Sequence, residues 1–182
     1  RGDDVTRLVK GGPTVPTVLA TGARPAPLLL AVRGELVMPR SEFQAVNARL
    51  LKRGKAPLAN PRNAVAGALR RREVDAMAGS LRFVAFEILG ADGAEFTSAS
   101  EQLAALEGWG LPIVASRTAR SREEVEAFYL ELARAREELD VELDGVVVKL
   151  DSLEDRAELG RTSHHPRWAL AVKFEPRKEL TC

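Results

Sequence analysis

The sequence predicts an α+β fold built as a single domain. Segments with strand-like and helix-like patterns interleave irregularly, without the regular strand–helix repeat of a doubly wound parallel sheet. The chain has 182 residues, of which 45% are hydrophobic, enough to bury one sizeable core. This length suits one domain rather than two. We find no internal repeat or low-complexity segment.

The composition narrows the class of protein. The chain carries 27 Lys and Arg against 26 Asp and Glu, so any binding of nucleic acid must come from a local patch. The single cysteine, Cys182, excludes an intrachain disulfide and a four-cysteine zinc site, and it fits a reducing, cytoplasmic setting. No apolar run approaches the roughly 20 residues of a spanning helix, so we expect no membrane partner.

The N-terminal part is expected to lead into a charged strand. Residues 1–27 are rich in Pro, Gly and Thr and lack a sustained period, which predicts an irregular lead-in. Residues 28–38 are apolar and strand-like. Within them Arg33 and Glu35 lie two apart, so both project from one face of the strand. Gly34 between them leaves room for a ligand.

Two helices are expected next. The first follows Ser41, which has capping-box spacing, and it ends at Gly54. Residues at helical spacing form its expected core face: Phe43, Val46, Asn47, Leu50 and Leu51. The second has Asn60 as its N-cap and Pro61 as its first helical residue, and it runs through small side chains to Arg70. Such a helix can pack very close to its neighbour.

The middle of the chain predicts a central strand and two more helices. Residues 81–89 are apolar on both faces, as in a strand buried between neighbours. Ser98 and Ser121 each precede a glutamate by three residues, which predicts a capped helix after each serine. The second of these helices carries an expected buried stripe: Val125, Phe128, Tyr129, Leu132 and Leu139.

Two strands at 143–150 and 168–174 flank a short helix at 152–158 that Gly160 ends. Alternation along the second strand predicts a core face of Trp168, Leu170, Val172 and Phe174. Its other face then carries Ala169, Ala171 and Lys173. An ammonium group on a floor of alanines suits a bound phosphate, because nothing bulky competes for the space. The alternative is a solvated lysine on an exposed sheet face.

Asp144 and Lys149 begin and end the preceding strand. They lie five residues apart, so strict alternation puts them on opposite faces. If both line one pocket, the strand must bend or bulge, and Gly145 is the natural place. In the alternative interpretation, Asp144 and Gly145 form a turn and Lys149 is a solvated strand residue.

Arginines mark the helix at 60–70. Arg62 and Arg70 lie about 80° apart around the helix, roughly on one side. Arg70 begins a cluster of three arginines that suits nucleic-acid phosphates. Arginines in a last helical turn also complement the helix dipole, so this second explanation stays open.

Three other positions have both a functional and an ordinary explanation. Phe86 could stack on adenine, although most strand phenylalanines belong to the core. Arg136, eight residues before Asp144, is ordinarily a solvated helix residue. His164 and His165 diverge on a strand and lack a third ligand, so we reject a metal site there.

Five blocks in one order resemble the NAD-dependent DNA ligase family of bacteria. They cover residues 30–39, 60–70, 82–86, 144–149 and 168–174, and residues 2–6 are similar to a further family segment. The resemblance therefore spans nearly the whole chain. It implies part of an adenylation domain over residues 1–182, with an ATP-grasp-like nucleotidyltransferase core of antiparallel sheets and flanking helices.

The resemblance also implies roles at the nucleotide. Glu35 is expected to contact the AMP ribose, and Phe86 to stack on adenine where the family usually has tyrosine. Lys149 is expected to reach the adenine edge or the phosphate, and Lys173 to neutralise the α-phosphate. The carboxylate of Asp144 is implied to be linked to a metal.

Several arginines also match positions of the family. Arg62 and Arg70 match residues that serve the nucleotide and the phosphates of nicked DNA. Arg136 matches a family arginine at the same spacing before 144–149, and we expect it to contact the nucleotide. Arg1 is a further nucleotide contact if residues 1–3 belong to the Arg-Gly-Asp-Gly element of the family.

The implied reaction is nick sealing in replication and repair, with NAD as the AMP donor and Mg²⁺ as the metal. AMP passes from NAD to a lysine, then to a DNA 5′-phosphate, and leaves when the 3′-hydroxyl attacks. The implied partners are nicked double-stranded DNA and the remaining ligase parts. These are the nicotinamide-binding region and the OB, zinc-finger, helix-hairpin-helix and BRCT domains.

The sequence departs from the family at the nucleophile. The 182 residues contain no Lys-x-Asp-Gly, and the nearest match, at 149–152, ends in serine and already belongs to another motif. Family members carry this lysine shortly upstream, so we expect the chain alone to be inactive in self-adenylation. His164 and His165 also replace the usual Arg-Ala of the family.

Two rival functions remain. A non-catalytic module derived from a ligase would bind adenylate or nicked DNA without chemistry. An ATP-dependent ligase or capping enzyme shares several of the blocks, but it lacks the one at 60–70.

Overall fold

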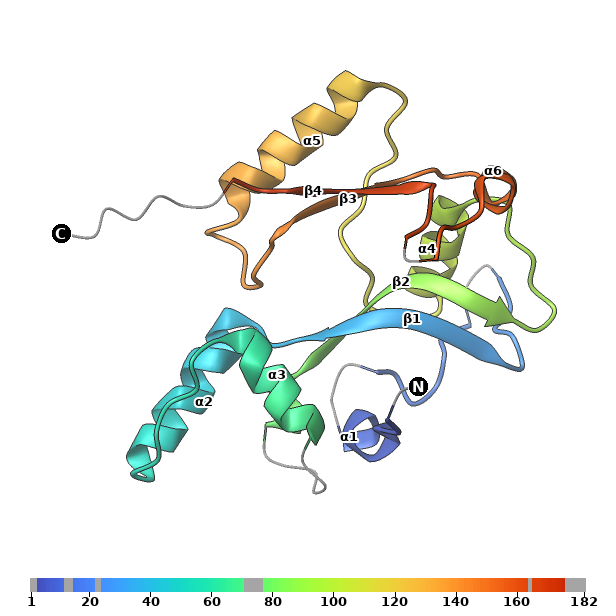
Figure 1. The fold of residues 1–182 in the computed structure, drawn as a ribbon. Helices are drawn as coiled ribbons and strands as arrows, with labels where there is room; N and C mark the ends of the chain where they lie inside the picture. The colour runs from blue at the N-terminus through green and yellow to red at the C-terminus, as the bar shows by residue number, and fades with distance from the viewer. Residues whose placement is uncertain (1–2, 12–14, 22–23, 71–76, 164, 176–182) are drawn as a thin grey trace. The chain divides into compact units, whose positions relative to one another are not determined.

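The computed structural model describes residues 3–11, 15–21, 24–70, 77–163 and 165–175 of the chain (Figure 1). The chain divides into two units. The first comprises Arg1–Phe96 with Ser100–Ala115, and the second comprises Thr97–Ala99 with Ser116–Cys182. Helices accompany small antiparallel sheets in this structure, in agreement with the predicted α+β class. None of its described helices is long and apolar enough to cross a membrane.

The sheet of the first unit pairs β1 (Leu30–Val37) with β2 (Arg82–Ala91) in antiparallel orientation (Figure 1). On its other side β2 forms a parallel bridge between Ala85 and Ile113. The amide of Ala85 donates to the carbonyl of Pro112 at 2.8 Å, and the amide of Val114 donates to the carbonyl of Ala85 at 2.9 Å. The predicted central strand thus has a neighbour on each side.

The β1–β2 register contains two irregularities. Val32 pairs with Ile88 and Ala31 with Gly90, so Leu89 has no partner on β1. Arg33 pairs with Glu87 and Gly34 with Ala85, so Phe86 is likewise an extra residue on β2. Each is a β-bulge, which bends the strand and redirects the side chains near it.

Two groups of buried side chains form the core of the first unit. One lies among α2 (Arg40–Lys52), α3 (Pro61–Arg70) and the 3₁₀ turn η1 (Ala78–Ser80). It contains Met38, Val46, Ala64, Val65, Ala68, Met77, Ala78 and Leu81. The other joins β2 to α4 (Ala99–Gly108) and the turn after it. It contains Ala85, Ile88, Ala105, Leu106, Trp109 and Leu111.

The starts of α2 and α3 show one wrong prediction and one confirmed. The N-cap of α2 is Pro39, without a side-chain cap, and the first helical bond runs from the amide of Phe43 to the carbonyl of Pro39. The predicted cap Ser41 therefore lies inside the helix. At α3 the amide of Asn63 donates to Oδ1 of Asn60 at 2.7 Å, as predicted from the Asn-Pro start.

The expected lead-in contains one helix that the sequence patterns did not predict. α1 (Thr6–Gly11) begins where the hydroxyl and amide of Thr6 donate to Asp4, and these bonds lower the pKa of the Asp4 carboxyl below its ordinary value. Further along, Arg24 pairs with Glu101 and stacks 4.7 Å from the centre of the Phe96 ring. These contacts tie the end of the lead-in to the β2–α4 part of the unit.

The second unit contains α5 (Arg122–Ala135), β3 (Gly145–Lys149), α6 (Leu153–Leu159) and β4 (Ala169–Lys173). The strands β3 and β4 pair antiparallel without a register shift. Ser121 caps α5 by accepting from the amide of Glu124 at 3.3 Å, and Ser152 caps α6 by accepting from that of Asp155 at 3.2 Å. Gly160 ends α6 with φ of 63°, as predicted.

The stripe predicted to be buried on α5 is only half-buried. Its residues on α5, Val125, Phe128, Tyr129 and Leu132, are of intermediate exposure, and Leu139 lies beyond the end of the helix at Ala135. The aromatic residues of the stripe instead make specific contacts. The Arg117 guanidinium stacks 4.7 Å from the centre of the Phe128 ring, and the rings of Tyr129 and Phe174 lie 5.1 Å apart. Of these two contacts, the one between Tyr129 and Phe174 joins the helix to the residue that follows β4.

Candidate functional site

The predicted site residues fall in both units. Glu35, Phe86, Arg62 and Arg70 belong to the first unit, and four others belong to the second. Those of the second unit are Arg136, Asp144, Lys149 and Lys173. The remaining candidate, Arg1, lies outside the described residues.

One face of the β1–β2 sheet gathers charged side chains. Arg33 and Glu35 are both exposed, whereas their neighbours along β1 are half-buried, so they share a face as predicted. Nη1 of Arg33 donates to Oε2 of Glu87 at 2.7 Å. The Glu35 side chain lies one pleat further along the same face, opposite Val84.

The bulge lets two successive residues, Phe86 and Glu87, lie on this face. Val84 lies opposite Glu35, and alternation puts Phe86 on the same side as Val84. Glu87 lies opposite Arg33, so both residues at the bulge are directed to the charged face. Phe86 is half-buried and, within the described part of the chain, is not among the hydrophobic residues packed on either core group. An aromatic ring therefore accompanies Arg33 and Glu35.

The helix α3 presents its arginines away from the core. Its buried residues are Pro61, Ala64, Val65 and Ala68, which form one stripe of the helix. Arg62 and Arg70 are exposed on the remaining surface. Asn60 fixes the start of the helix. The buried small side chains pack α3 on the core, while the two arginines lie on its exposed side. Arg71 and Arg72 lie outside the described residues.

The two lysines of the second unit share one face of the β3–β4 sheet. Gly145 pairs with Lys173 and Lys149 with Ala169, and directly opposed residues project to the same side. Alternation adds Val147 and Ala171 to this face. The two lysine side chains therefore project from opposite ends of this face. Its other residues, a glycine, two alanines and one valine, form the floor between them.

β3 pairs with β4 in regular register, so Gly145 does not form the bulge that would bring Asp144 and Lys149 into one pocket. The glycine is needed for close packing instead. A side chain at this position would collide with the carbonyl oxygen of Val172 and with the Cα of Lys173. Asp144 is exposed just before the strand, where its carbonyl accepts from the amide of Phe174 at 2.9 Å.

The opposite face of β4 is less buried than predicted. Phe174 is buried and Val172 and Trp168 are half-buried, but Leu170 is 64% exposed. The reason is the small size of the second unit, because its two-stranded sheet has too few neighbours to cover both faces.

The helix α5 fixes the end of β4 that carries Lys173. The hydroxyl of Tyr129 donates to the backbone carbonyl of Lys173 at 3.3 Å. The guanidinium of Arg136 lies 5.7 Å from the centre of the Phe174 ring and donates to the carbonyl of Glu175 at 3.5 Å. Sequence patterns singled out Tyr129 only as part of a core stripe, and its hydroxyl contact depends on a partner 44 residues away.

Arg156 holds the other end of the same sheet, and no sequence pattern pointed to it. It is only 7% exposed on α6, its Nε donates to the carbonyl of Leu150 at 2.5 Å, and its guanidinium stacks 4.5 Å from the centre of the Trp168 ring. Leu150 follows Lys149 directly and Trp168 precedes Ala169. Arg156 therefore connects both strands next to the Lys149 end of the floor.

Comparison with known proteins decides the family. The profile of the NAD-dependent DNA ligase adenylation domain matches residues 1–177. The chain belongs to the NAD-dependent DNA ligase adenylation-domain family.

Curated relatives of this adenylation-domain chain are named DNA ligase. That of Syntrophobacter fumaroxidans is 41% identical over 184 residues, covering 99% of this chain and 27% of the relative. That of Thermobifida fusca is 38% identical over 182 residues, covering 99% of this chain and 24% of the relative. That of Geotalea uraniireducens is 40% identical over 182 residues, with coverage of 99% and 27%. The chain thus spans about a quarter of the length of these relatives.

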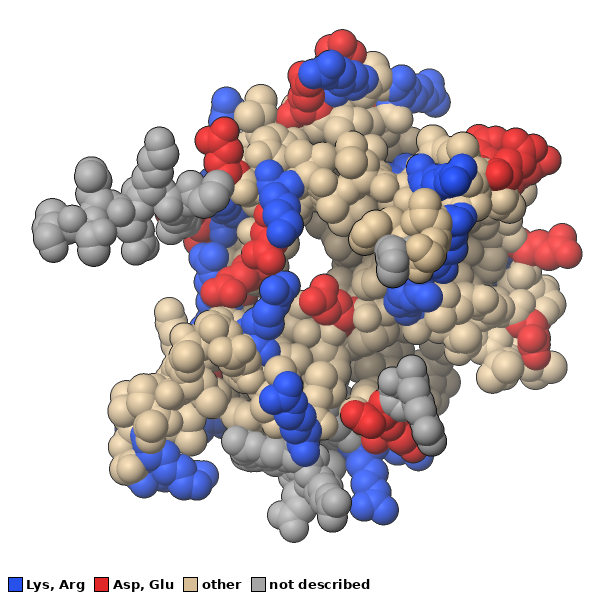
Figure 2. Space-filling view, viewed as in Figure 1, with Lys and Arg blue, Asp and Glu red and all other residues tan. Residues whose placement is uncertain are grey.

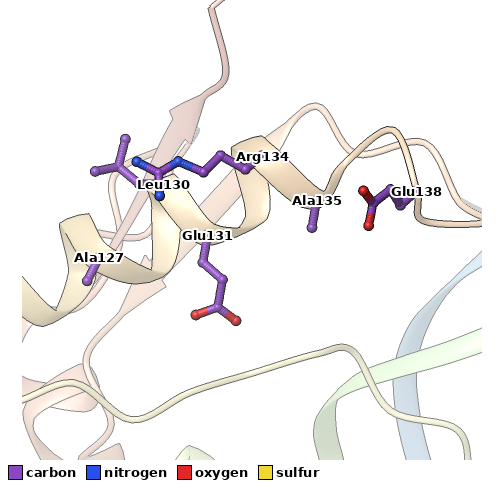
Figure 3. A pocket seen from close by; sticks show the side chains of 6 residues that line it. All are labelled: Ala127, Leu130, Glu131, Arg134, Ala135 and Glu138. Atoms are coloured by element: carbon purple, nitrogen blue, oxygen red, sulfur yellow. The ribbon is translucent and has the colours of Figure 1, made fainter.

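The described residues of this adenylation-domain chain contain no group of three or more His, Cys, Asp or Glu side chains that could hold a metal. A hollow along α5 is lined by six residues of that helix and the turn after it: Ala127, Leu130, Glu131, Arg134, Ala135 and Glu138 (Figure 3). None of the predicted site residues lines this hollow. The first unit thus offers the charged face of β1–β2 and the helix α3 as candidate surfaces, and the second unit offers the lysine face of β3–β4.

Proposed function

We propose that this chain is the adenylation-domain portion of an NAD-dependent DNA ligase that seals nicks in the cytoplasm during replication and repair. A lysine attacks the α-phosphorus of NAD, and nicotinamide mononucleotide leaves. The AMP then passes from that lysine to the 5′-phosphate at the nick. Attack by the DNA 3′-hydroxyl forms the phosphodiester bond and releases AMP.

The observation that carries this proposal is the face shared by Lys149 and Lys173. Transfer of AMP develops negative charge on the oxygens of the α-phosphate, and fixed cations stabilise that charge in the transition state. The floor between the lysines bears only small side chains and Val147, so a phosphate can approach the strands closely. In this proposal Lys173 neutralises the α-phosphate, and Lys149 contacts the phosphate or the adenine edge.

The face of β1–β2 supplies the groups for the nucleoside. We assign the ribose contact to Glu35, because a carboxylate accepts hydrogen bonds from hydroxyl groups. We assign adenine stacking to Phe86, because an aromatic ring holds a base without hydrogen bonding. Phe86 retains the ring of the usual tyrosine and lacks its hydroxyl. Arg1 is a further proposed nucleotide contact.

The arginines serve the substrate phosphates in this proposal. Arg62 and Arg70 contact the DNA phosphates at the nick, since phosphate contacts fix the position of a protein on the duplex. We assign Arg136 a nucleotide contact. Its stacking on Phe174 limits how far its guanidinium can move, so it also supports the strand that carries Lys173.

Mg²⁺ is the proposed metal. This ion is usually held by one or two carboxylates together with substrate phosphates and water. The exposed carboxylate of Asp144 fits as one such ligand. When bound, the ion offsets phosphate charge, while Lys149 and Lys173 act through their own ammonium groups.

The nucleophilic lysine is proposed to come from a Lys-x-Asp-Gly segment outside these 182 residues, because their sequence contains none. The further partners are then the nicotinamide-binding region and the OB, zinc-finger, helix-hairpin-helix and BRCT parts of a complete ligase.

The test uses NAD labelled in its adenine. One sample is this chain, and the other is a chimeric ligase in which this chain replaces the matching stretch of the Thermobifida fusca relative. We expect stable label on the chimeric ligase, discharged by nicked DNA, and none on the chain alone. Label on the chain alone refutes the proposal that the nucleophilic lysine lies outside these 182 residues. An unlabelled chimera that binds adenylate supports a non-catalytic module, and preferential use of ATP refutes the NAD assignment.

A further inference from the structure

Positive charge is concentrated in one stretch of this nearly neutral chain. Residues 43–72 contain no Asp or Glu, although the whole sequence has 26 of them. The same stretch contains eight basic residues: Arg49, Lys52, Arg53, Lys55, Arg62, Arg70, Arg71 and Arg72. Only Arg62 and Arg70 have a role in the proposed function, so the cations at the end of α2 are unexplained.

The structure presents these cations on the outside of the α2–α3 pair. Val46 of α2 and the buried stripe of α3 belong to one core group, which fixes the inner side of each helix. Lys52, Arg53 and Lys55 are exposed, and no ion pair within the described residues involves them. Figure 2 shows basic side chains at the free end of α2. We call Lys52, Arg53 and Lys55 the α2 basic end.

The backbone of the α2 basic end is held in place. The amide of Lys55 donates to the carbonyl of Leu50 at 2.9 Å, and Gly54 makes this turn with φ of 66°. Asn47 then accepts from the amide of Leu58 at 2.7 Å and donates to its carbonyl at 3.2 Å. The three cations therefore stand on an ordered turn that leads directly into the helix bearing Arg62.

The side chains around this turn favour a phosphate backbone over bases as the ligand. Residues 44–82 contain no aromatic side chain, so this surface has no platform for stacking unpaired bases. Clustered lysine and arginine without aromatic neighbours are typical of contacts with the phosphates of a duplex. Such contacts position a protein and carry no sequence information.

We propose that the α2 basic end binds the phosphate backbone of double-stranded DNA away from the nick, and so extends the contact made by Arg62 and Arg70. This inference rests on the proposed function, because it takes the DNA substrate of that function as its ligand. It adds a surface that holds intact duplex as well as nicked duplex.

The test measures binding of this chain to a fluorescent nicked duplex and to the same duplex without the nick, by anisotropy over a range of salt concentrations. The test variant carries Lys52→Gln, Arg53→Gln and Lys55→Gln. A control variant with Arg7→Gln, Lys10→Gln and Arg120→Gln loses the same charge at exposed positions elsewhere. Thermal unfolding of each variant checks that the fold is kept.

We expect the test variant to lose about tenfold or more in affinity at low salt, equally for both duplexes. The slope of log K against log salt should become shallower by about 2 to 3, since each lost phosphate contact contributes about 0.9. The control variant should keep the wild-type slope. Equal slopes for the wild type and the test variant overturn the inference and leave the proposed function intact. If the wild type does not bind DNA, both the inference and the assignment of Arg62 and Arg70 as DNA contacts are overturned. Nucleotide transfer is tested separately, by labelling of the chimeric ligase.

Discussion

Arg33 of β1 and Glu87 of β2 form an ion pair at 2.7 Å directly beside the bulged residue Phe86. The pair joins the two strands at the point where the register shifts. It thereby adds a side-chain link between the strand that carries Glu35 and Glu87, the residue that follows Phe86. The ring proposed for adenine and the carboxylate proposed for ribose are linked through this pair.

The first prediction concerns this pair in the chimeric ligase. Arg33→Ala and Glu87→Ala should each raise the KM for NAD by up to about fivefold with little change in kcat, because partly exposed ion pairs contribute about 1 kcal/mol or less. The charge-swapped double variant, with Arg33→Glu and Glu87→Arg, should recover much of the loss. Steady-state kinetics of nick sealing, with NAD as the varied substrate and nicked DNA in excess, measures both effects.

Removal of the exposed pair between Arg117 and Glu131 is the matched control, because its atoms lie at a similar distance of 2.8 Å. It should leave the KM for NAD unchanged. A fall in kcat with an unchanged KM in the Arg33 and Glu87 variants contradicts a role in positioning the nucleoside.

The second prediction concerns the lysines of β3 and β4. In the chimeric ligase, Lys149→Ala and Lys173→Ala should each slow lysyl-AMP formation by about 100-fold or more. This is the usual cost of removing one group that stabilises developing charge. Their unfolding temperatures should stay close to wild type, because neither side chain is fully buried. Rapid-quench labelling with NAD measures the rate.

Lys10→Ala on α1 serves as the control for the loss of one exposed lysine. It should adenylate at the wild-type rate. If either floor lysine can be removed without slowing adenylation, the shared face is not the phosphate site.

Local signals predicted the ends of several helices correctly. Asn60, Ser121 and Ser152 act within three residues of themselves, so the sequence contains all that determines these caps. The prediction that Ser41 caps α2 was wrong because Pro39 occupies the N-cap position. Its φ of −54° is compatible with a helix start, and it already accepts the first helical bond.

Features that depend on strand pairing could not be predicted. Alternation was sufficient to put Arg33 with Glu35, but the register that makes Phe86 an extra residue pairs Arg33 with Glu87, 54 positions further along the chain. Alternation within one strand likewise could not show that Lys149 and Lys173 share a face. The family blocks named these residues, while the pairing explains how two of them can act together.

The third prediction separates the DNA role of α3 from nucleotide chemistry. Arg70→Ala in the chimeric ligase should reduce nick sealing far more than lysyl-AMP formation, because its guanidinium is assigned to DNA phosphates. The salt slope of duplex binding should become shallower by about 1, the contribution of one phosphate. Gel assays of sealing and of adenylation, run on the same samples, measure the two steps.

Arg134→Ala on α5 removes another arginine that has no assigned role in the reaction. It should leave both steps unchanged. Equal loss of sealing and adenylation in Arg70→Ala contradicts a role confined to DNA.

The last prediction tests why residue 145 is a glycine. In Gly145→Ala the new methyl group would meet the carbonyl of Val172 and the Cα of Lys173, so β4 must move away from β3. We expect a loss of about 1 to 3 kcal/mol in stability from overpacking. In the chimeric ligase, the rate of lysyl-AMP formation should fall by more than this loss of stability explains, because the displaced residue is Lys173 itself. Gly90→Ala on β2 is the control, since no neighbouring atom lies within 4 Å of the point that its methyl group would occupy. A Gly145→Ala variant that unfolds and adenylates like Gly90→Ala would show that the close approach of β3 and β4 does not position the lysine.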